Sequence, residues 1–213
     1  MDDSETLEKI YEKPGAVWTK TQPPKELVEL VETGKVKPCK TVDLGCGEGF
    51  YSIYLASKGF DVTGIDISEK AIRYAKQNAA EAEVKIRFLT MNITDLHKLN
   101  DKFDFIFEWA LMHHIMPQQR QKYAADVNRI LNKGGKYLSV CFNEKSHTFS
   151  GPGEKHRESG ERAPGLKIYF SSLEELKTLF SPYFRITEAK LIEVPSVGYE
   201  KPHTENYIFM EKP

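Results

Sequence analysis

The sequence predicts an α/β domain built on a doubly wound, mostly parallel sheet of seven strands with helices on both faces. Three observations support this fold class. The 213 residues suit one domain, strand-like apolar segments alternate with helix-like segments over residues 38–142, and a glycine-rich turn joins the first strand to the next helix. Strands that alternate with helices pair in parallel through right-handed crossovers, and such sheets bind ligands at the carboxyl ends of their strands.

Boundary residues place the elements before residue 143. Pro24 suits the first turn of a helix over residues 24–34, and Gly34 suits its exit. Ser68 suits the N-cap of a later helix, and Gly134 and Gly135 suit the end of a helix over residues 117–131. Periodicity predicts a helix from residue 50 to the stop at 58–59 and strands at 41–44, 61–66, 84–89, 103–107 and 136–142.

The alternation stops after residue 142. Glycines, prolines and charges fill residues 143–167, which predicts a long surface loop, either a lid near the ligand or a plain mobile connection. Ser171 and Glu174 have capping-box spacing for a helix that ends near Phe180, and strands at 184–194 and 206–210 form a β-hairpin at the sheet edge. The domain thus comprises a helical arm (1–37), a core (38–142), a lid loop (143–170) and a C-terminal helix and hairpin (171–213).

Charge and composition narrow the class of protein. The 30 basic and 31 acidic residues give a formal net charge of −1, so nothing favours a nucleic-acid partner. No apolar stretch reaches the roughly 18 residues of a membrane helix, and the acidic start lacks the features of a secretory signal. We therefore expect a cytoplasmic monomer or homodimer with no membrane partner. Cys39, Cys46 and Cys141 lack zinc-site spacing and cannot all pair as disulfides.

The most informative segment is the glycine loop, residues 43–49. Glycines at positions 45, 47 and 49 let the backbone turn tightly and approach a ligand, and the following helix presents free amides. Asp66 closes the next strand, where a carboxylate can accept hydrogen bonds from both ribose hydroxyls of an adenosine cofactor. The alternative interpretation is a plain turn in which Asp66 caps a helix.

Phe50 bears on the choice of cofactor. A dinucleotide-binding loop reads G-x-G-x-x-G or A, and after Gly45 and Gly47 the third position here is Phe50. Because this bulky ring disfavours a pyrophosphate packed on the turn, an NAD-type oxidoreductase is the weaker alternative. No glycine is followed by Lys and then Ser or Thr, so a Walker-type phosphate loop is not indicated.

With these motifs the chain resembles the class I S-adenosylmethionine-dependent methyltransferases of Rossmann-like fold, including the type 11 group. The first motif of that family is an acid followed by alternating glycines, as in residues 43–49. The resemblance covers about residues 38–142 and includes the segments 64–68, 103–106, 111–114 and 131–135. Residues 18–24 and 169–176 more faintly resemble small-molecule methyltransferases of the thiopurine and tellurite-resistance type, which methylate thiols and other soft nucleophiles.

The resemblance implies S-adenosylmethionine as the cofactor, with S-adenosylhomocysteine as its product. The glycines would line the methionine part, Asp66 would hold the ribose and Ile67 would pack on adenine. Asn92 stands where family members usually carry an acid that binds the adenine amino group, and Asp95 is the alternative. The implied cofactor-binding residues are Asp43, Gly45, Cys46, Gly47, Gly49, Asp66, Ile67, Asn92, Ile93, Glu108 and Trp18.

Candidate catalytic residues follow the fourth strand, where the family places substrate-facing groups. His113 or His114 can take a proton from an alcohol, amine or thiol near neutral pH, although either can instead be structural. Adjacent histidines on a helix point apart and no cysteine or acid completes a ligand set, so we expect no metal. Trp109 and Tyr11 are candidates to face the substrate and the sulfonium charge.

These features favour an enzyme of the S-adenosylmethionine-dependent methyltransferase class that transfers a methyl group, by in-line displacement, to the S, O or N atom of a small molecule. The near-neutral charge and the short segment after the core leave little for docking a macromolecule. Two alternatives stay open: an NAD-type oxidoreductase, and a module that binds S-adenosylmethionine without turnover.

Overall fold

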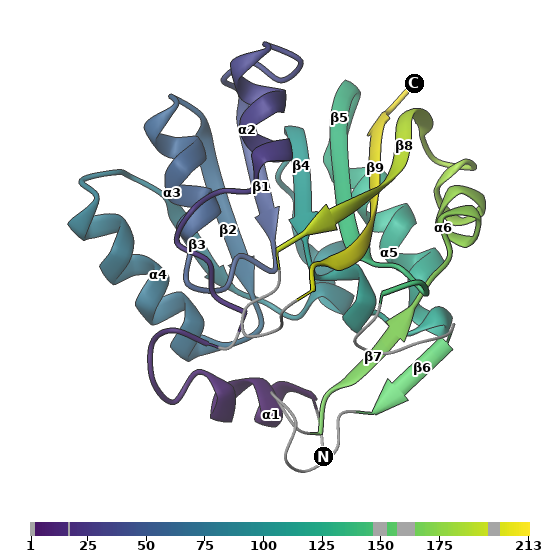
Figure 1. Ribbon diagram of the computed structural model, residues 1–213. Helices are drawn as coiled ribbons and strands as arrows, with labels where there is room; N and C mark the ends of the chain where they lie inside the picture. Colours follow the sequence, from purple (N-terminus) through teal and green to yellow (C-terminus); the bar gives the residue numbers. More distant parts are fainter. Residues whose placement is uncertain (1–2, 17, 147–152, 157–164, 196–200) are drawn as a thin grey trace.

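The computed structural model describes residues 3–16, 18–146, 153–156, 165–195 and 201–213 (Figure 1). Seven strands form one sheet in the order β3-β2-β1-β4-β5-β9-β8. The first five are parallel, and β9 runs antiparallel to both β5 and β8. The predicted doubly wound sheet with a C-terminal edge hairpin is therefore confirmed. The strands are β1 (Lys40–Leu44), β2 (Asp61–Asp66), β3 (Arg87–Thr90), β4 (Phe103–Trp109), β5 (Leu131–Phe142), β8 (Arg185–Val194) and β9 (His203–Glu211).

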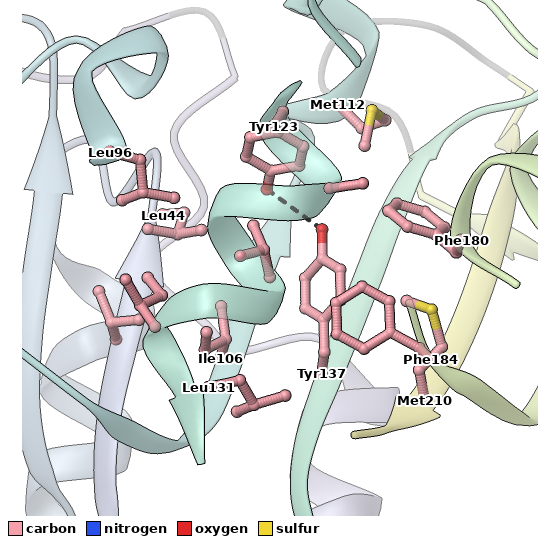
Figure 2. Packing of buried hydrophobic residues seen from close by; sticks show 14 of the residues in the cluster. Leu44, Leu96, Ile106, Met112, Tyr123, Leu131, Tyr137, Phe180, Phe184 and Met210 are labelled. Atoms are coloured by element: carbon pink, nitrogen blue, oxygen red, sulfur yellow. Dashed lines mark hydrogen bonds between the residues drawn. The ribbon is translucent and has the colours of Figure 1, made fainter. Parts of the chain in front are cut away.

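Helices cover both faces of this sheet (Figure 1). On one face, α2 (Lys25–Glu32) and α3 (Phe50–Ser57) pack on the strands through Leu27 and Leu55, and α4 (Glu69–Glu81) packs beside α3. On the other face, α5 (Pro117–Ile130) and α6 (Leu173–Phe180) bury the larger core. Figure 2 shows this core, in which Tyr123 of α5 meets Tyr137 of β5. Among the described residues, none of the helices is both long and apolar enough to cross a membrane.

Two predicted boundaries of the core are wrong. The third strand starts at Arg87 instead of residue 84, because Glu83 takes a left-handed conformation and the amide of Val84 donates to Ala79 at the end of α4. The glycine pair expected to end the fifth helix lies inside β5 instead, since α5 stops at Ile130. Gly134 has a φ of 76° there and donates its amide to Lys212.

The segment after β5 also differs from the expected loop. Within it, β6 (Gly153–His156) pairs antiparallel with β7 (Lys167–Phe170), so part of the loop is a hairpin beside the main sheet. The rest of the expected lid, residues 147–152 and 157–164, lies outside the described residues. Ser172 is the N-cap of α6 and accepts a hydrogen bond from the amide of Glu175, one position after the predicted pair of residues 171 and 174.

The N-terminal arm contains a helix that the sequence did not predict individually, α1 (Asp3–Ile10). It lies below the carboxyl ends of the central strands, next to the β6–β7 hairpin (Figure 1). The Glu8 carboxylate accepts a hydrogen bond from the amide of Glu69 at the start of α4, and Tyr11 and Ala16 pack on Ala71. The arm therefore crosses the end of the sheet at which parallel α/β folds bind ligands.

Candidate active site

A cavity of about 330 Å³ opens at the carboxyl ends of the central strands. This volume lies within the range of small-molecule and cofactor sites. Its walls come from the N-terminal arm, the glycine loop, the segments that follow β2, β3 and β4, and Phe142 at the end of β5. All the site residues expected from the sequence line it except Glu108, namely Tyr11, Trp18, Asp43, Gly45, Cys46, Gly47, Gly49, Asp66, Ile67, Asn92, Ile93, Trp109, His113 and His114.

The glycine loop leaves β1 in left-handed conformations that favour glycine. Gly47 has a φ of 52°, and a Cβ added to it lies 3.0 Å from the hydroxyl oxygen of Tyr11. Gly49 has a φ of 82°, and an added Cβ lies 3.0 Å from the Cβ of Ala75 in α4. These two glycines thus let the arm and α4 approach the loop, a packing role that the sequence did not indicate.

Asp66 is held at the end of β2 by two backbone amides. Its carboxylate accepts hydrogen bonds from Gly47, at 2.8 Å, and from Ser68, at 3.0 Å. Each oxygen keeps a further acceptor position, and burial raises the pKa of this carboxyl above its usual range, although the amides oppose the shift. The group can therefore accept hydrogen bonds from a vicinal diol, which fits the ribose of an adenosine cofactor.

Asp43 lies below the glycine loop. Its carboxylate accepts a hydrogen bond from the hydroxyl of Ser52 in α3 at 2.6 Å, and it is 3% exposed. Burial raises the pKa of Asp43 to about 7, despite the Ser52 hydrogen bond. Burial likewise raises the pKa of the neighbouring Cys46 thiol well above its usual range, so Cys46 is a poor nucleophile.

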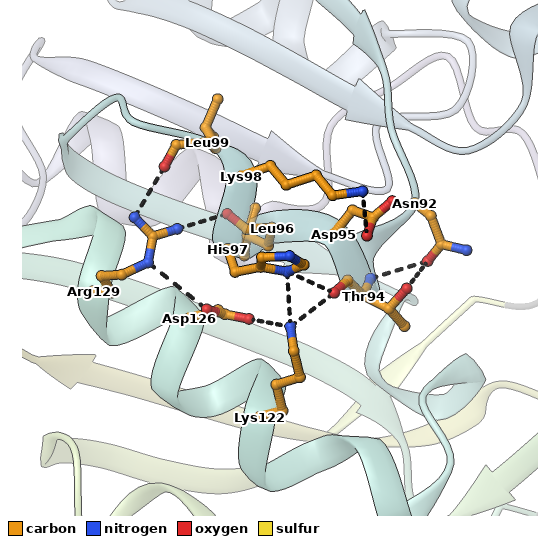
Figure 3. A network of polar contacts seen from close by, with 10 residues as sticks. All are labelled: Asn92, Thr94, Asp95, Leu96, His97, Lys98, Leu99, Lys122, Asp126 and Arg129. Atoms are coloured by element: carbon orange, nitrogen blue, oxygen red, sulfur yellow. Dashed lines mark hydrogen bonds and ion pairs between the residues drawn. The ribbon is translucent and has the colours of Figure 1, made fainter.

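Asn92 follows β3 and lines the cavity, whereas Asp95 is not among the lining residues. The Asn92 side-chain oxygen already accepts hydrogen bonds from the amide and the hydroxyl of Thr94, at 2.9 Å and 2.8 Å. Its NH₂ group therefore stays as a donor for a ligand, opposite to the acceptor role expected from the sequence. Asp95 instead pairs with Lys98 at 3.0 Å (Figure 3).

The turn that carries Asn92 is fixed from α5. Figure 3 shows Lys122 and Arg129 reaching the 3-10 turn η1 (Ile93–Lys98). Lys122 donates to the Thr94 carbonyl at 2.8 Å, and Arg129 donates to the carbonyls of Leu96 and Leu99 at 2.7 Å and 2.9 Å. The wall formed by residues 91–94 is therefore supported by two side chains of α5.

Glu108 does not line the cavity, and its surroundings do not favour the expected contact with the cofactor's ammonium group. It is fully buried, and its carboxyl accepts hydrogen bonds from the amides of Leu111 and Met112, at 3.0 Å and 3.1 Å, and from the hydroxyl of Ser139. Burial raises its pKa to about 8, against the effect of these hydrogen bonds. Glu108 shapes the turn that carries the two histidines.

The two histidines lie together on the short turn η2 (Met112–His114) and both line the cavity. Their ring centroids are 4.5 Å apart, so the expectation that they point apart is wrong. The ring of His113 also stacks on Phe142 at the end of β5, with centroids 4.2 Å apart and 17° between the ring planes. Among the described residues, no group of three metal-ligating side chains is close enough to hold a metal ion.

Sequence reasoning missed Glu48, Lys20 and Arg120. Glu48 lies in the glycine loop and Lys20 on the arm, and both line the cavity. Arg120 lies behind the histidine turn, where its side chain is 4% exposed and donates to Ser171 and to Ile115. The charged residue between two glycines was a signal for Glu48, whereas the sequence pattern did not single out Lys20 or Arg120.

Comparison with known proteins assigns the region around this cavity to a family. Residues 41–135 match the family described as a methyltransferase domain. Residues 41–135 therefore form a methyltransferase domain. The matched region of this methyltransferase holds the glycine loop, Asp66, Asn92 and both histidines, whereas the arm and Phe142 lie outside it.

Curated relatives share the central region of the methyltransferase. The 2-heptyl-1-hydroxyquinolin-4(1H)-one methyltransferase of Mycobacteroides abscessus is 30% identical over 128 residues, which cover 60% of this chain and 56% of that protein. The ubiquinone biosynthesis O-methyltransferase of Coxiella burnetii is 33% identical over 102 residues, which cover 48% of this chain and 43% of that protein. The chain thus spans about half the length of these two relatives.

Solved structures share the fold over most of the chain. A SAM-dependent methyltransferase from Methanosarcina mazei has a TM-score of 0.73 and 24% identity, covering 90% of this chain and 98% of its own. TehB from Haemophilus influenzae has a TM-score of 0.70 and 19% identity, covering 91% of this chain and 64% of its own. At these identities the likeness extends to the fold alone.

Proposed function

We propose that this methyltransferase transfers the methyl group of S-adenosylmethionine to a nucleophilic atom of a small molecule. One observation carries the proposal: a single cavity joins the glycine loop and Asp66 to His113 and His114. A cofactor seated on the loop and an acceptor beside the histidines would then share one cavity, which holds the reacting atoms together.

The half of the cavity nearest β1 and β2 fits the cofactor. Asp66 can accept from the ribose hydroxyls, and Asn92 can donate to a ring nitrogen of adenine. Asp43 lies below the loop and can accept from an ammonium group, because a nearby cation lowers the pKa of a buried carboxyl and restores its negative charge. When bound, the cofactor supplies a methyl group already activated on a sulfonium.

The half nearest β4 and β5 fits the acceptor. Aromatic side chains, Tyr51, Trp109 and Phe142, line it together with the two histidines and Lys20. An imidazole there can take the proton from an O–H, S–H or N–H group as the nucleophile bonds to the methyl carbon and the sulfur–carbon bond breaks. Aromatic walls suit a flat apolar acceptor body, and Lys20 suits a partial negative charge on it.

The names of the relatives support particular acceptors for a first test. One relative is named as a methyltransferase of a hydroxyquinolone and another as an O-methyltransferase. Since this chain spans only part of those proteins, the names guide the choice of compounds without fixing the acceptor. Hydroxylated aromatic and heteroaromatic compounds should lead the panel, with thiols and amines beside them.

Calorimetry and mass spectrometry test the proposal. We expect S-adenosylhomocysteine to bind and NAD not to bind, and we expect Asp66→Ala to weaken S-adenosylhomocysteine binding by about tenfold or more, since a charge-assisted hydrogen bond contributes roughly 1.5–3 kcal/mol. The acceptor panel is then incubated with S-adenosylmethionine, and product masses are read. Binding of NAD in place of S-adenosylhomocysteine would overturn the proposal, and binding without methylation of any acceptor would favour a module without turnover.

A further inference from the structure

Glu48 is a buried acid between two glycines of the loop, and its carboxylate is occupied by one distant segment. It is 5% exposed. Oε1 accepts hydrogen bonds from the amides of Gly15 and Ala16, at 2.9 Å and 3.0 Å, and from the hydroxyl of Thr19 at 2.7 Å. The amide of Gly15 also donates a hydrogen bond to Oε2, at 3.1 Å. These donors belong to residues 15, 16 and 19, so several donors of the arm converge on one carboxylate.

The backbone of Glu48 is fixed on the side away from the arm. Its carbonyl accepts a hydrogen bond from the side-chain amide of Asn78 in α4 at 2.9 Å. The neighbouring Gly47 donates its amide to Asp66, which the cofactor site requires. The same short loop therefore holds the proposed cofactor site and anchors the arm.

The anchored arm supplies part of the cavity roof. The indole of Trp18 donates a hydrogen bond to the hydroxyl of Tyr11 at 2.9 Å, and both rings line the cavity. The Tyr11 hydroxyl lies against Gly47, close enough that a Cβ at that position would meet it. Thr19 and Lys20 continue the roof toward the acceptor half.

Other contacts of the arm with α4 are more exposed. Glu12, which is 70% exposed, pairs with Lys70, and Lys70 also donates to the carbonyl of Glu8. Solvent screening makes such surface pairs weak, whereas hydrogen bonds to a buried carboxylate are strong and costly to leave unmade. Glu48 is therefore the main polar attachment of the arm over the cavity.

We propose that Glu48 is a positioning residue that holds residues 11–16 and 18–20 as a closed roof over the cofactor and the acceptor. The inference rests on the proposed function, because the roof matters only if the cavity binds these ligands. Opening the roof returns the carboxylate and its donors to water, which replaces their hydrogen bonds, so the attachment is reversible. Ligand affinity then depends on the fraction of molecules with the arm closed.

The test follows Trp18, which is one of two tryptophans in the chain. In a Trp109→Phe background, acrylamide quenching of fluorescence reports the exposure of Trp18 alone. We expect Glu48→Ala to increase the quenching and to weaken S-adenosylhomocysteine binding by about tenfold, the effect of a tenfold smaller closed population. Glu48→Gln keeps one acceptor oxygen and should recover part of both properties.

Glu12→Ala is the matched control, since it removes the same charge from an exposed contact of the same arm. It should change quenching and affinity by less than about twofold. If Glu48→Ala binds S-adenosylhomocysteine as the parent does, with unchanged quenching, the inference is overturned. Circular dichroism checks folding, and Glu48→Gln carries the test if Glu48→Ala does not fold. If the unmodified protein fails to bind S-adenosylhomocysteine, the proposed function is overturned instead. Acrylamide quenching of Trp18 then still shows whether Glu48 holds the arm.

Discussion

Glu108 and Arg120 hold opposite sides of the turn that carries the two histidines. The Glu108 carboxyl accepts hydrogen bonds from the backbone amides of Leu111 and Met112. The Arg120 guanidinium donates hydrogen bonds to the carbonyls of Met112 and Ile115, at 3.4 Å and 2.7 Å. Glu108 thus binds backbone amides at the start of the turn, and Arg120 binds one carbonyl at its start and one just after its end. Ala110, with a φ of 65°, adds a strained backbone conformation just before this turn.

The same arginine connects the histidine turn to the segment after β7, which predicts a large effect of its removal. It donates to the Ser171 hydroxyl at 2.6 Å and stacks over the ring of Tyr169. Arg120→Ala leaves several buried acceptors without a donor, so the free energy of unfolding should fall by about 3 kcal/mol in urea titrations. Arg185→Ala, at a 62% exposed side chain paired with Glu211, should cost less than about 0.5 kcal/mol. Equal costs for the two variants would contradict the role of the buried network.

The buried carboxyl of Glu205 should make the free energy of unfolding depend on pH. Its side chain is buried in β9, Oε2 has no hydrogen-bond partner among the described residues, and burial raises its pKa to about 8 although Lys20 opposes the shift. Between about pH 4.5 and 8 the unfolded chain binds fewer protons at this site than the folded chain. Its contribution to stability is therefore complete below pH 4.5 and is lost as pH rises, by up to about 1.4 kcal/mol per pH unit.

The amide variant isolates this group from the other buried acids. Glu205→Gln cannot ionise, so its stability relative to the parent should rise steadily between pH 5 and 8 in urea titrations. Glu174→Gln, at a 77% exposed side chain of α6, is the surface control and should stay within about 0.5 kcal/mol of the parent. A constant difference between Glu205→Gln and the parent across this range would show that the acid is already ionised in the folded protein.

Replacing His113 should change turnover without changing cofactor binding. If its imidazole takes the acceptor proton, His113→Gln should lower turnover of any acceptor found by about 100-fold. S-adenosylhomocysteine affinity should change by less than about threefold, because the cofactor residues of β1 and β2 are untouched. His97→Gln, at an exposed histidine of η1 outside the cavity lining, is the control. Full activity of His113→Gln would leave His114, or no general base, as the explanation.

The glycine loop and Asp66 could be predicted because their signal is local. The turn, its left-handed residues and the acid at the end of β2 fall within about 20 residues, and their conformations follow from residue type. The parallel pairing of the first five strands also followed from alternation alone. Both features depend on short-range patterns that every fold of this class shares.

The remaining parts of the site depend on contacts between distant segments. Glu48 binds residues 15, 16 and 19 across about 30 positions of the sequence, and Arg120 binds Ser171 across 51 positions. No pattern in either segment names its partner, because the path of the arm and of the β6–β7 hairpin is decided by packing. The same reason explains why the surroundings of Glu108 could not be predicted, since its amide donors exist only once the turn after β4 has formed.

The hydroxyls of Tyr123 and Tyr137 form a buried pair, 3.1 Å apart, between α5 and β5 (Figure 2). Among the described residues, Tyr137 is the only hydrogen-bond partner of Tyr123, whereas Tyr137 also interacts with Ser139. Tyr137→Phe thus leaves a buried hydroxyl without a partner, and it should lower the free energy of unfolding by about 1–3 kcal/mol. Tyr123→Phe should cost less, because Ser139 still meets the remaining hydroxyl.

A double-mutant cycle tests whether these costs come from the pair. Removing both hydroxyls leaves no unsatisfied group, so Tyr123→Phe with Tyr137→Phe should cost less than the sum of the single variants, with a coupling of about 1 kcal/mol. Tyr183→Phe, at a more exposed hydroxyl 3.3 Å from Gln121, is the control and should cost less than about 0.5 kcal/mol. Additive costs would mean that each ring stabilises the core through packing alone. Coupling would show that the hydroxyl pair itself joins α5 to β5.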